Sequence, residues 1–253
     1  MTVKNANRDA IVHGKITTDP LRDKPAFPSW AMKMTMAITG LIFGLFVLVH
    51  MIGNLKIYMG EEHLNDYAEF LRTALEPLFP REGVLWIARI VLLVCLVLHV
   101  YCGLALHGRA RRSRGKFRRT GLVSGMNTFA ARSMVVTGLV LLLFIIFHIL
   151  DLTLGVRPIG SSEFEENTAG HAHAYANLIH SFDRPGVAIF YILAMVILFV
   201  HLSHGIWTAI SDLGITGHRW RQVMLLVAYI VPAIIMIGNI SIPLAVLTGA
   251  ISL

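Results

Sequence analysis

The chain has 253 residues, of which 55% are hydrophobic and 15% are charged, and its formal charge at pH 7 is +7. The apolar residues fall in long blocks and the mean hydropathy is +0.66, which excludes an ordinary soluble domain and predicts a membrane protein with several spans. The basic residues lie between these blocks without interleaved aromatic side chains, so the charge indicates membrane orientation rather than binding of nucleic acid.

Residues 1–30 form a polar arm, which we expect to lie on the aqueous surface and to contact a partner. The first apolar block covers about 31–58, with Lys33 near its start and Lys56 near its end. Between these lysines lie 22 uncharged residues, and about 20 apolar residues are enough to cross a bilayer. The acidic stretch that follows, 59–83, has a composition compatible with a helix.

Four further apolar blocks are each long enough to cross the membrane. The connection after the second block contains the strongest charge run of the chain, Arg109 to Arg119, in which seven of eleven residues are basic. The connection 156–185 is acidic, and we expect Pro232 and Pro243 to kink the last block. The four blocks cover about 84–107, 133–154, 186–210 and 222–251.

The charges between the blocks predict an orientation. With five spans, the arm, the Arg109–Arg119 run and the basic turn at Arg219 and Arg221 all fall on one side, and such segments prefer the cytoplasm. We therefore expect an all-α membrane protein with five transmembrane helices in a single domain, 31–251, with its N-terminus cytoplasmic and its C-terminus outside. Every aqueous segment is too short for a catalytic domain, so another chain must supply any soluble chemistry.

Four histidines each stand singly in an apolar run: His50, His99, His148 and His201, which are 49, 49 and 53 residues apart. A histidine inside a membrane loses the hydration of its ring nitrogens, so it usually occurs there because something binds it. At a rise of about 1.5 Å per residue, His50 and His148 lie about 26 and 24 Å from the inner ends of their helices. His99 and His201 lie about 15 and 16 Å from theirs.

The four histidines thus divide into an outer pair, His50 with His148, and an inner pair, His99 with His201. Two levels of paired imidazoles allow four helices to hold two flat cofactors, each with two axial nitrogen ligands. Haem b meets this requirement, so four of the five helices are predicted to form a haem-binding bundle.

Small residues beside three of these histidines favour a bound porphyrin, which needs space next to its ligand. Gly103 and Gly205 each follow an inner histidine by four residues, one turn along the same face. Gly53 follows His50 by three residues, whereas His148 has no comparable glycine.

Other ligands are possible from spacing alone. His204 lies three residues after His201 on nearly the same face, about 12 Å from the inner end of its helix, and is the alternative ligand there. Cys95 and Cys102 share a helix face with an inner histidine and allow an iron–sulfur centre, although a rise of about 10 Å between them disfavours it. The motif of His171 and His173 is a weak metal signal, and the remaining histidines outside the spans are predicted to be surface residues, with His107 at the membrane boundary.

The whole chain resembles the cytochrome b558-type membrane anchor of succinate dehydrogenase and fumarate reductase, in its actinobacterial form. The motifs are HGKITTDPLRDKPAFPSWAMK, HMIGNLK, LHVYCG, RSRGKFRRTG, FHILDLT, HLSHGIW and DLGITGHRWR. The resemblance implies that His50 and His148 ligate an outer b haem and that His99 and His201 ligate an inner one. It favours His201 over His204, because the family places glycine four residues after its second and fourth ligands.

The resemblance implies a flavin-free membrane subunit of succinate:menaquinone oxidoreductase, respiratory complex II, in the bacterial cytoplasmic membrane. Electrons would pass from FAD and iron–sulfur clusters in partner subunits, docked on the cytoplasmic face, through two haems to menaquinone. Some fumarate reductases carry a glutamate two residues before the fourth ligand, where this chain has Phe199, so a proton path through that residue is not expected.

The family's usual outer quinone site and the haem propionates give further candidate residues. The quinone candidates are Asn54, Lys56, Glu69, Arg72, Glu76 and Arg89. The candidate propionate partners are Lys33, Arg89, His107 and Arg132.

Three alternatives share parts of this pattern. The first is an anchor of the same complex with a non-haem redox centre or none. The second is the cytochrome b of another quinone-linked enzyme, such as a hydrogenase or formate dehydrogenase, which lacks the specific HLSHGIW and HMIGNLK resemblance. The third is a transporter that uses histidines for protons or metal, which would not need two matched depths and would be expected to show an inverted repeat.

Overall fold

The computed structural model describes residues 26–114, 126–215 and 217–253. In these residues the regular structure is helical apart from a single β-bridge between Thr168 and His171. Five helical segments are long and apolar enough to cross a membrane, so the chain is an all-α, multi-pass membrane protein, as predicted. The segments are Ser29–Met59, Gly83–Ser113, Ser133–Thr153, Pro185–Asp212 and His218–Leu247.

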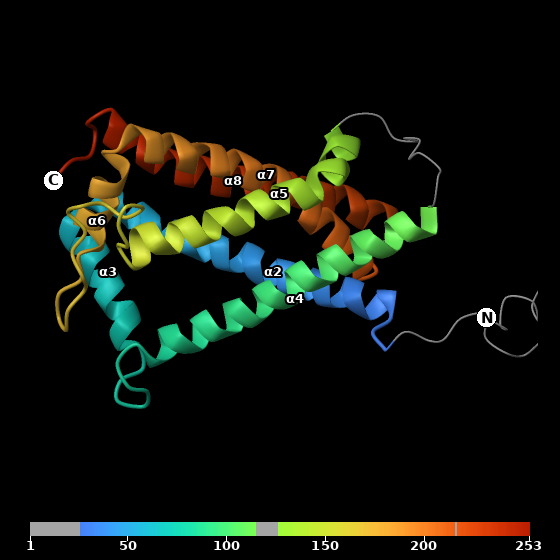
Figure 1. The fold of residues 1–253 in the computed structure, drawn as a ribbon, viewed down its shortest axis with the longest axis horizontal. Helices are drawn as coiled ribbons and strands as arrows, with labels where there is room; N and C mark the ends of the chain where they lie inside the picture. Colours follow the sequence, from blue (N-terminus) through green and yellow to red (C-terminus); the bar gives the residue numbers. More distant parts are fainter. Residues whose placement is uncertain (1–25, 115–125, 216) are drawn as a thin grey trace, which may run out of the picture.

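Figure 1 shows how the helices are arranged. In chain order they are α2 (Ser29–Asn54), the 3₁₀ turn η1 (Leu55–Met59), α3 (Glu61–Thr73), α4 (Gly83–Arg114), α5 (Met126–His148), the π-helical turn η2 (Ile149–Thr153), α6 (Ala174–Phe182), α7 (Pro185–Asp212) and α8 (His218–Leu247).

The predicted boundaries differ most from the structure at the end of α4 and at the start of α5, which begins at Met126 rather than at 133. Residues Arg109–Arg114 continue α4, so the prediction that the basic run is a loop is wrong for its first half. Arginine is a good helix former, and positive charge is favourable at a helix C-terminus. Helix α8 begins at His218 rather than at 222. The rest of the basic run, and the arm up to residue 25, lie outside the described residues.

Helices α2 and α7 form the centre of the bundle. Helix α2 contacts α4 and α7, while α7 also packs on α5 and α8. Helix α4 is peripheral. Only 6% of its most apolar stretch is buried, so most of its side chains face away from the other helices. The side chains of Cys95 and Cys102 are buried, and between them lies the half-buried His99.

Helices α3 and α6 lie at one end of the bundle, together with the C-terminus (Figure 1). The acidic stretch 156–185 is therefore not simply a solvated loop, because α6 buries Leu178, Ile179 and Phe182 against the ends of the long helices. His180 of α6 is only partly exposed and pairs with Glu163 at 2.9 Å, which corrects its prediction as a free surface histidine. The expected kinks at the two prolines of α8 stay a prediction.

Candidate functional site

The outer histidine pair comes together from two helices that are distant in sequence. His50 of α2 and His148 of α5 have ring centroids 5.8 Å apart, with planes at 85°. Two metal–imidazole bonds of about 2.0 Å each put the ring centroids about 6 Å apart, so this spacing fits two axial ligands of one metal ion. Phe46 and Phe144 stack on these rings at 5.4 and 5.9 Å, each from the preceding helical turn.

The inner histidines lie on α4 and α7, and each ring nitrogen meets a threonine of a neighbouring helix. His99 Nδ1 is 3.1 Å from Thr39 Oγ1 of α2, and His201 Nδ1 is 3.0 Å from Thr137 Oγ1 of α5. Each inner histidine ring thus contacts one threonine hydroxyl, and the two contacts are equivalent.

The helix backbone decides which atom donates in these contacts. The Thr39 hydroxyl donates to Thr35 O at 2.7 Å, and the Thr137 hydroxyl donates to Ser133 O at 3.0 Å. With its hydrogen used in this way, each threonine oxygen can only accept, so the histidine Nδ1 must carry the proton. The Nε2 atom of each inner ring then has a free lone pair, the form in which neutral imidazole binds a metal.

A glycine next to each threonine lets the imidazole ring lie close to the helix backbone. A Cβ atom at Gly40 would lie 3.2 Å from His99 Cε1, and one at Gly138 would lie 3.4 Å from His201 Cε1. Both distances are short for carbon atoms in contact. Each inner ring therefore contacts a threonine hydroxyl at Nδ1 and lies against the backbone of the adjacent glycine at Cε1.

Sequence reasoning missed these Thr–Gly pairs, although an internal repeat marks them. The segments 36–41 (MAITGL) and 134–139 (MVVTGL) share their Met, Thr, Gly and Leu positions. A separation of 98 residues relates Thr39 to Thr137 and also His50 to His148. Eleven residues separate threonine from histidine in each copy, about three helical turns, so one face of α2 and of α5 carries both.

The glycines that follow the inner histidines border open space. No atom lies within 4 Å of a Cβ placed at Gly205, and only Met36 Sδ, at 3.8 Å, approaches one at Gly103. The prediction that Gly53 leaves space for a cofactor beside His50 is wrong. Three atoms of the Tyr67 side chain lie 2.6 to 3.0 Å from a Cβ placed at Gly53. Helix α3 occupies that side, so Gly53 makes room for a tyrosine rather than for a cofactor.

A buried carboxylate supports the outer ligand His148. Its Nδ1 lies 3.3 Å from Tyr191 Oη, and that hydroxyl donates to Asp151 Oδ2 at 2.9 Å. Ser181 and Arg184 also donate to Asp151, whose side chain is fully buried. Because the tyrosine proton goes to the carboxylate, His148 Nδ1 must donate to the tyrosine, which again leaves Nε2 free. Asp151 was not among the predicted residues, although a carboxylate inside an apolar span is itself a signal of function.

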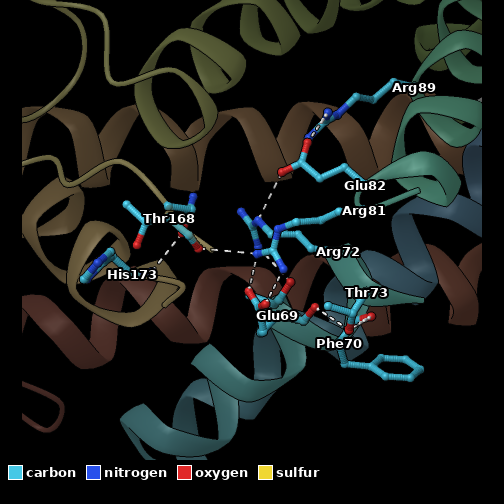
Figure 2. Close-up of polar contacts among 11 residues, drawn as sticks. Glu69, Phe70, Arg72, Thr73, Arg81, Glu82, Arg89, Thr168 and His173 are labelled. Carbon is cyan, nitrogen blue, oxygen red and sulfur yellow. Dashed lines mark hydrogen bonds and ion pairs between the residues drawn. The ribbon is translucent and has the colours of Figure 1, made fainter. Parts of the chain in front are cut away.

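A second polar cluster lies where α3 approaches the start of α4, and Figure 2 shows its members. Arg81 donates to both carboxylate oxygens of Glu69, at 2.6 and 2.8 Å. Arg72 and Arg89 flank Glu82, at 3.5 and 3.3 Å. The structure therefore brings together three of the predicted quinone residues, Glu69, Arg72 and Arg89, and adds Arg81 and Glu82, which the prediction lacked.

The remaining quinone candidates lie apart from this cluster. Asn54 is half-buried at the end of α2, and Lys56 Nζ lies over the Tyr67 ring, 5.5 Å from its centroid. Glu76 is exposed in the turn after α3. The six residues are thus not one site in this structure.

The pKa values of the cluster follow from its contacts. The two hydrogen bonds from Arg81 hold the pKa of Glu69 below its ordinary value, against an opposing effect of burial. Burial lowers the pKa of the Arg72 guanidinium, and the neighbouring carboxylates oppose this shift. Both Glu69 and Arg72 are therefore charged at neutral pH.

Replacing Glu69 with glutamine tests this ion pair through the pH dependence of stability. Since the pKa of Glu69 is lowered on folding, its contribution is present above the ordinary glutamate value and disappears as the pH falls through the lowered value. We expect Glu69→Gln to lower Tm by about 2–3 °C at pH 7, with the difference from wild type vanishing in acid. Thermal unfolding at a series of pH values measures this. Glu62→Gln, at an exposed position of the same helix, is the control, and a Tm difference that persists unchanged in acid would contradict the assignment.

The propionate candidates have varied surroundings. Lys33 Nζ lies 3.4 Å from Asp212 Oδ1 and ties the first turns of α2 to the end of α7. His107 is exposed on α4, and Arg89 belongs to the polar cluster at the start of α4. The side chain of Arg132 lies outside the described residues.

The iron–sulfur alternative finds no supporting geometry. Cys95 and Cys102 are free thiols. Within residues 26–114, 126–215 and 217–253, no three or more His, Cys, Asp or Glu side chains gather in a way that could hold a metal ion. A haem iron needs only two protein ligands, because the porphyrin supplies the other four, so this finding does not bear on haem.

Comparisons with known proteins place the chain in no family. No protein-family model matches it, and a search of curated proteins finds no match. The class that the fold defines is a multi-pass, all-α membrane protein with paired histidines inside its bundle.

Proposed function

We propose that the chain is the di-haem cytochrome b membrane anchor of a succinate:menaquinone oxidoreductase, in the bacterial cytoplasmic membrane. The observation that carries the proposal is the pairing of His50 with His148, whose ring centroids lie 5.8 Å apart in an edge-to-face arrangement inside an apolar bundle. The tautomers of the other histidines support it, because His99, His148 and His201 all keep Nε2 free.

The proposal gives each histidine a position. His50 and His148 would hold the outer haem, and His99 and His201 the inner haem, with Gly103 and Gly205 leaving space beside the inner ligands. When bound, the haems supply one-electron transfer across the bundle. Thr39, Thr137 and Tyr191 would orient the imidazoles of His99, His201 and His148 and keep their Nδ1 atoms protonated.

The proposed docking face for the flavoprotein and iron–sulfur subunits is the cytoplasmic end, where residues 26–30 of the N-terminal arm also lie. Arg109 of α4 donates to Ser29 Oγ at 2.9 Å and to Phe27 O at 2.8 Å, which ties the end of the arm to the basic end of α4. Positive charge at this end supports a cytoplasmic N-terminus and an outside C-terminus. FAD and the iron–sulfur clusters would belong to the partner subunits.

For menaquinone we propose the outer cluster around Arg72. Its Nε is one of two buried side-chain nitrogen or oxygen atoms in the described part of the chain without a hydrogen bond. The nearby Glu82 oxygen, at 3.5 Å, balances the charge without satisfying that donor. A quinone carbonyl oxygen is an acceptor of the kind that this N–H lacks.

A reduced-minus-oxidised absorption spectrum of the purified chain tests the proposal. We expect the bands of a b-type haem, with two haems per chain by pyridine haemochrome assay. A transporter or an anchor with a different redox centre predicts no such bands. Full-length protein produced with excess haem and still lacking these bands would overturn the proposal.

A further inference from the structure

Thr39 and Thr137 occupy equivalent places in the two halves of the bundle. Each lies on a helix that carries an outer histidine, and each contacts an inner histidine on a different helix. We propose that these two threonines are positioning residues that set the reduction potential of the inner haem. The inference rests on the proposed function, because it assigns a role toward a haem that the inner histidines would hold.

The contacts restrict each inner ring in orientation as well as in tautomer. The threonine oxygen fixes Nδ1, and the neighbouring glycine places Cε1, the ring atom bonded to Nδ1, against helix backbone. For His99, the ring of Phe43 adds an edge contact, with centroids 6.1 Å apart at 82°. Rotation of the ring about its χ2 bond would break the hydrogen bond, so Nε2 points in one direction only.

An acceptor on Nδ1–H makes Nε2 a stronger donor toward a metal ion. Partial withdrawal of the Nδ1 proton leaves more electron density on the ring, which favours the ferric over the ferrous state. The acceptor here is a neutral hydroxyl whose own hydrogen is bound to a backbone carbonyl. Removing it should therefore raise the potential of the inner haem.

The outer pair provides an internal reference. His148 uses Tyr191 and Asp151 in place of a threonine, whereas the hydroxyls of Thr39 and Thr137 contact an inner ring and carbonyls of their own helices. In each helix the threonine and the outer histidine are about 16 Å apart along the axis. Substitution of either threonine should consequently shift the reduction potential of the inner haem and leave that of the outer haem unchanged.

Spectroelectrochemical titration of purified Thr39→Val, Thr137→Val and the double variant tests the inference. Valine keeps the shape of threonine and removes the acceptor. We expect the ratio of ferric to ferrous ligand affinity to change by about tenfold per threonine, which is a rise of about 59 mV for a one-electron couple. Thr39→Ser and Thr137→Ser, which restore the hydroxyl, should return the potential to the wild-type value.

Thr208→Val of α7 is the matched control. Its hydroxyl likewise donates to carbonyls of its own helix, at 2.9 and 3.0 Å, so the substitution removes the same intrahelical bonds. Loss of only the inner haem in the valine variants, with retention in the serine variants, also supports the inference. An unmoved inner potential, equal shifts of both haems, or the same shift in Thr208→Val overturns it. Absence of haem from the unaltered chain instead overturns the proposed function, and this inference with it.

Discussion

Replacing His201 with alanine is expected to remove the inner haem and to lower the haem content by about half. The ring of His201 has its Nδ1 bound by Thr137 and its Cε1 against Gly138, so its Nε2 is the oriented lone pair on α7. Alanine removes that ligand, and a b haem held by one remaining histidine would dissociate or change spin state. The haem-to-protein ratio and low-temperature spectra of the purified variant measure the loss.

His204→Ala is the matched control for this prediction. In the alignment of α7 with α4, His204 takes the place of Cys102, three residues after the proposed ligand and one before the glycine. Cys102 is a buried free thiol, so α4 carries no histidine at the position equivalent to His204. We expect His204→Ala to retain both haems. Loss of the inner haem in His204→Ala with retention in His201→Ala would show that the neighbouring histidine is the ligand.

Replacing Asp151 with alanine is expected to destabilise the protein by about 3–5 kcal/mol. Its carboxylate is fully buried and accepts hydrogen bonds from Ser181, Arg184 and Tyr191. The substitution leaves the Arg184 guanidinium without its carboxylate and removes the acceptor that orients the tyrosine hydroxyl. Because that hydroxyl holds His148, the outer haem should be lost or weakened before the inner one. Thermal or denaturant unfolding in detergent, followed by circular dichroism and haem absorbance, measures both effects.

Two further variants separate the parts of this effect. Tyr191→Phe keeps the ion pair and removes the link to His148, so it should alter the outer haem with a smaller cost of about 1–3 kcal/mol. Asp183→Asn changes an exposed carboxylate at the end of α6 and should alter neither stability nor haem. Stability of Asp151→Ala equal to that of wild type would contradict the structural role assigned to this carboxylate.

The five spans and the two levels of histidines follow from the sequence alone. Hydropathy and the rise per residue are properties of each segment by itself, so block length predicts a crossing and residue number predicts a depth. The depth estimate paired His50 with His148, and the structure places their rings in contact. The extension of α4 beyond His107 was missed because a helix does not have to end where apolar residues end.

The partners of the histidines were decided by tertiary structure. Whether Thr39 meets His99, or Tyr191 joins His148 to Asp151, depends on how each helix is rotated about its axis and on how closely neighbouring helices approach. The same holds for Gly53, whose space is taken by Tyr67 of α3. The sequence by itself determined the spans and the depth of each imidazole, because those are local properties. Only the packed bundle determined which polar atoms meet across helices, because such contacts exist only once the helices are assembled.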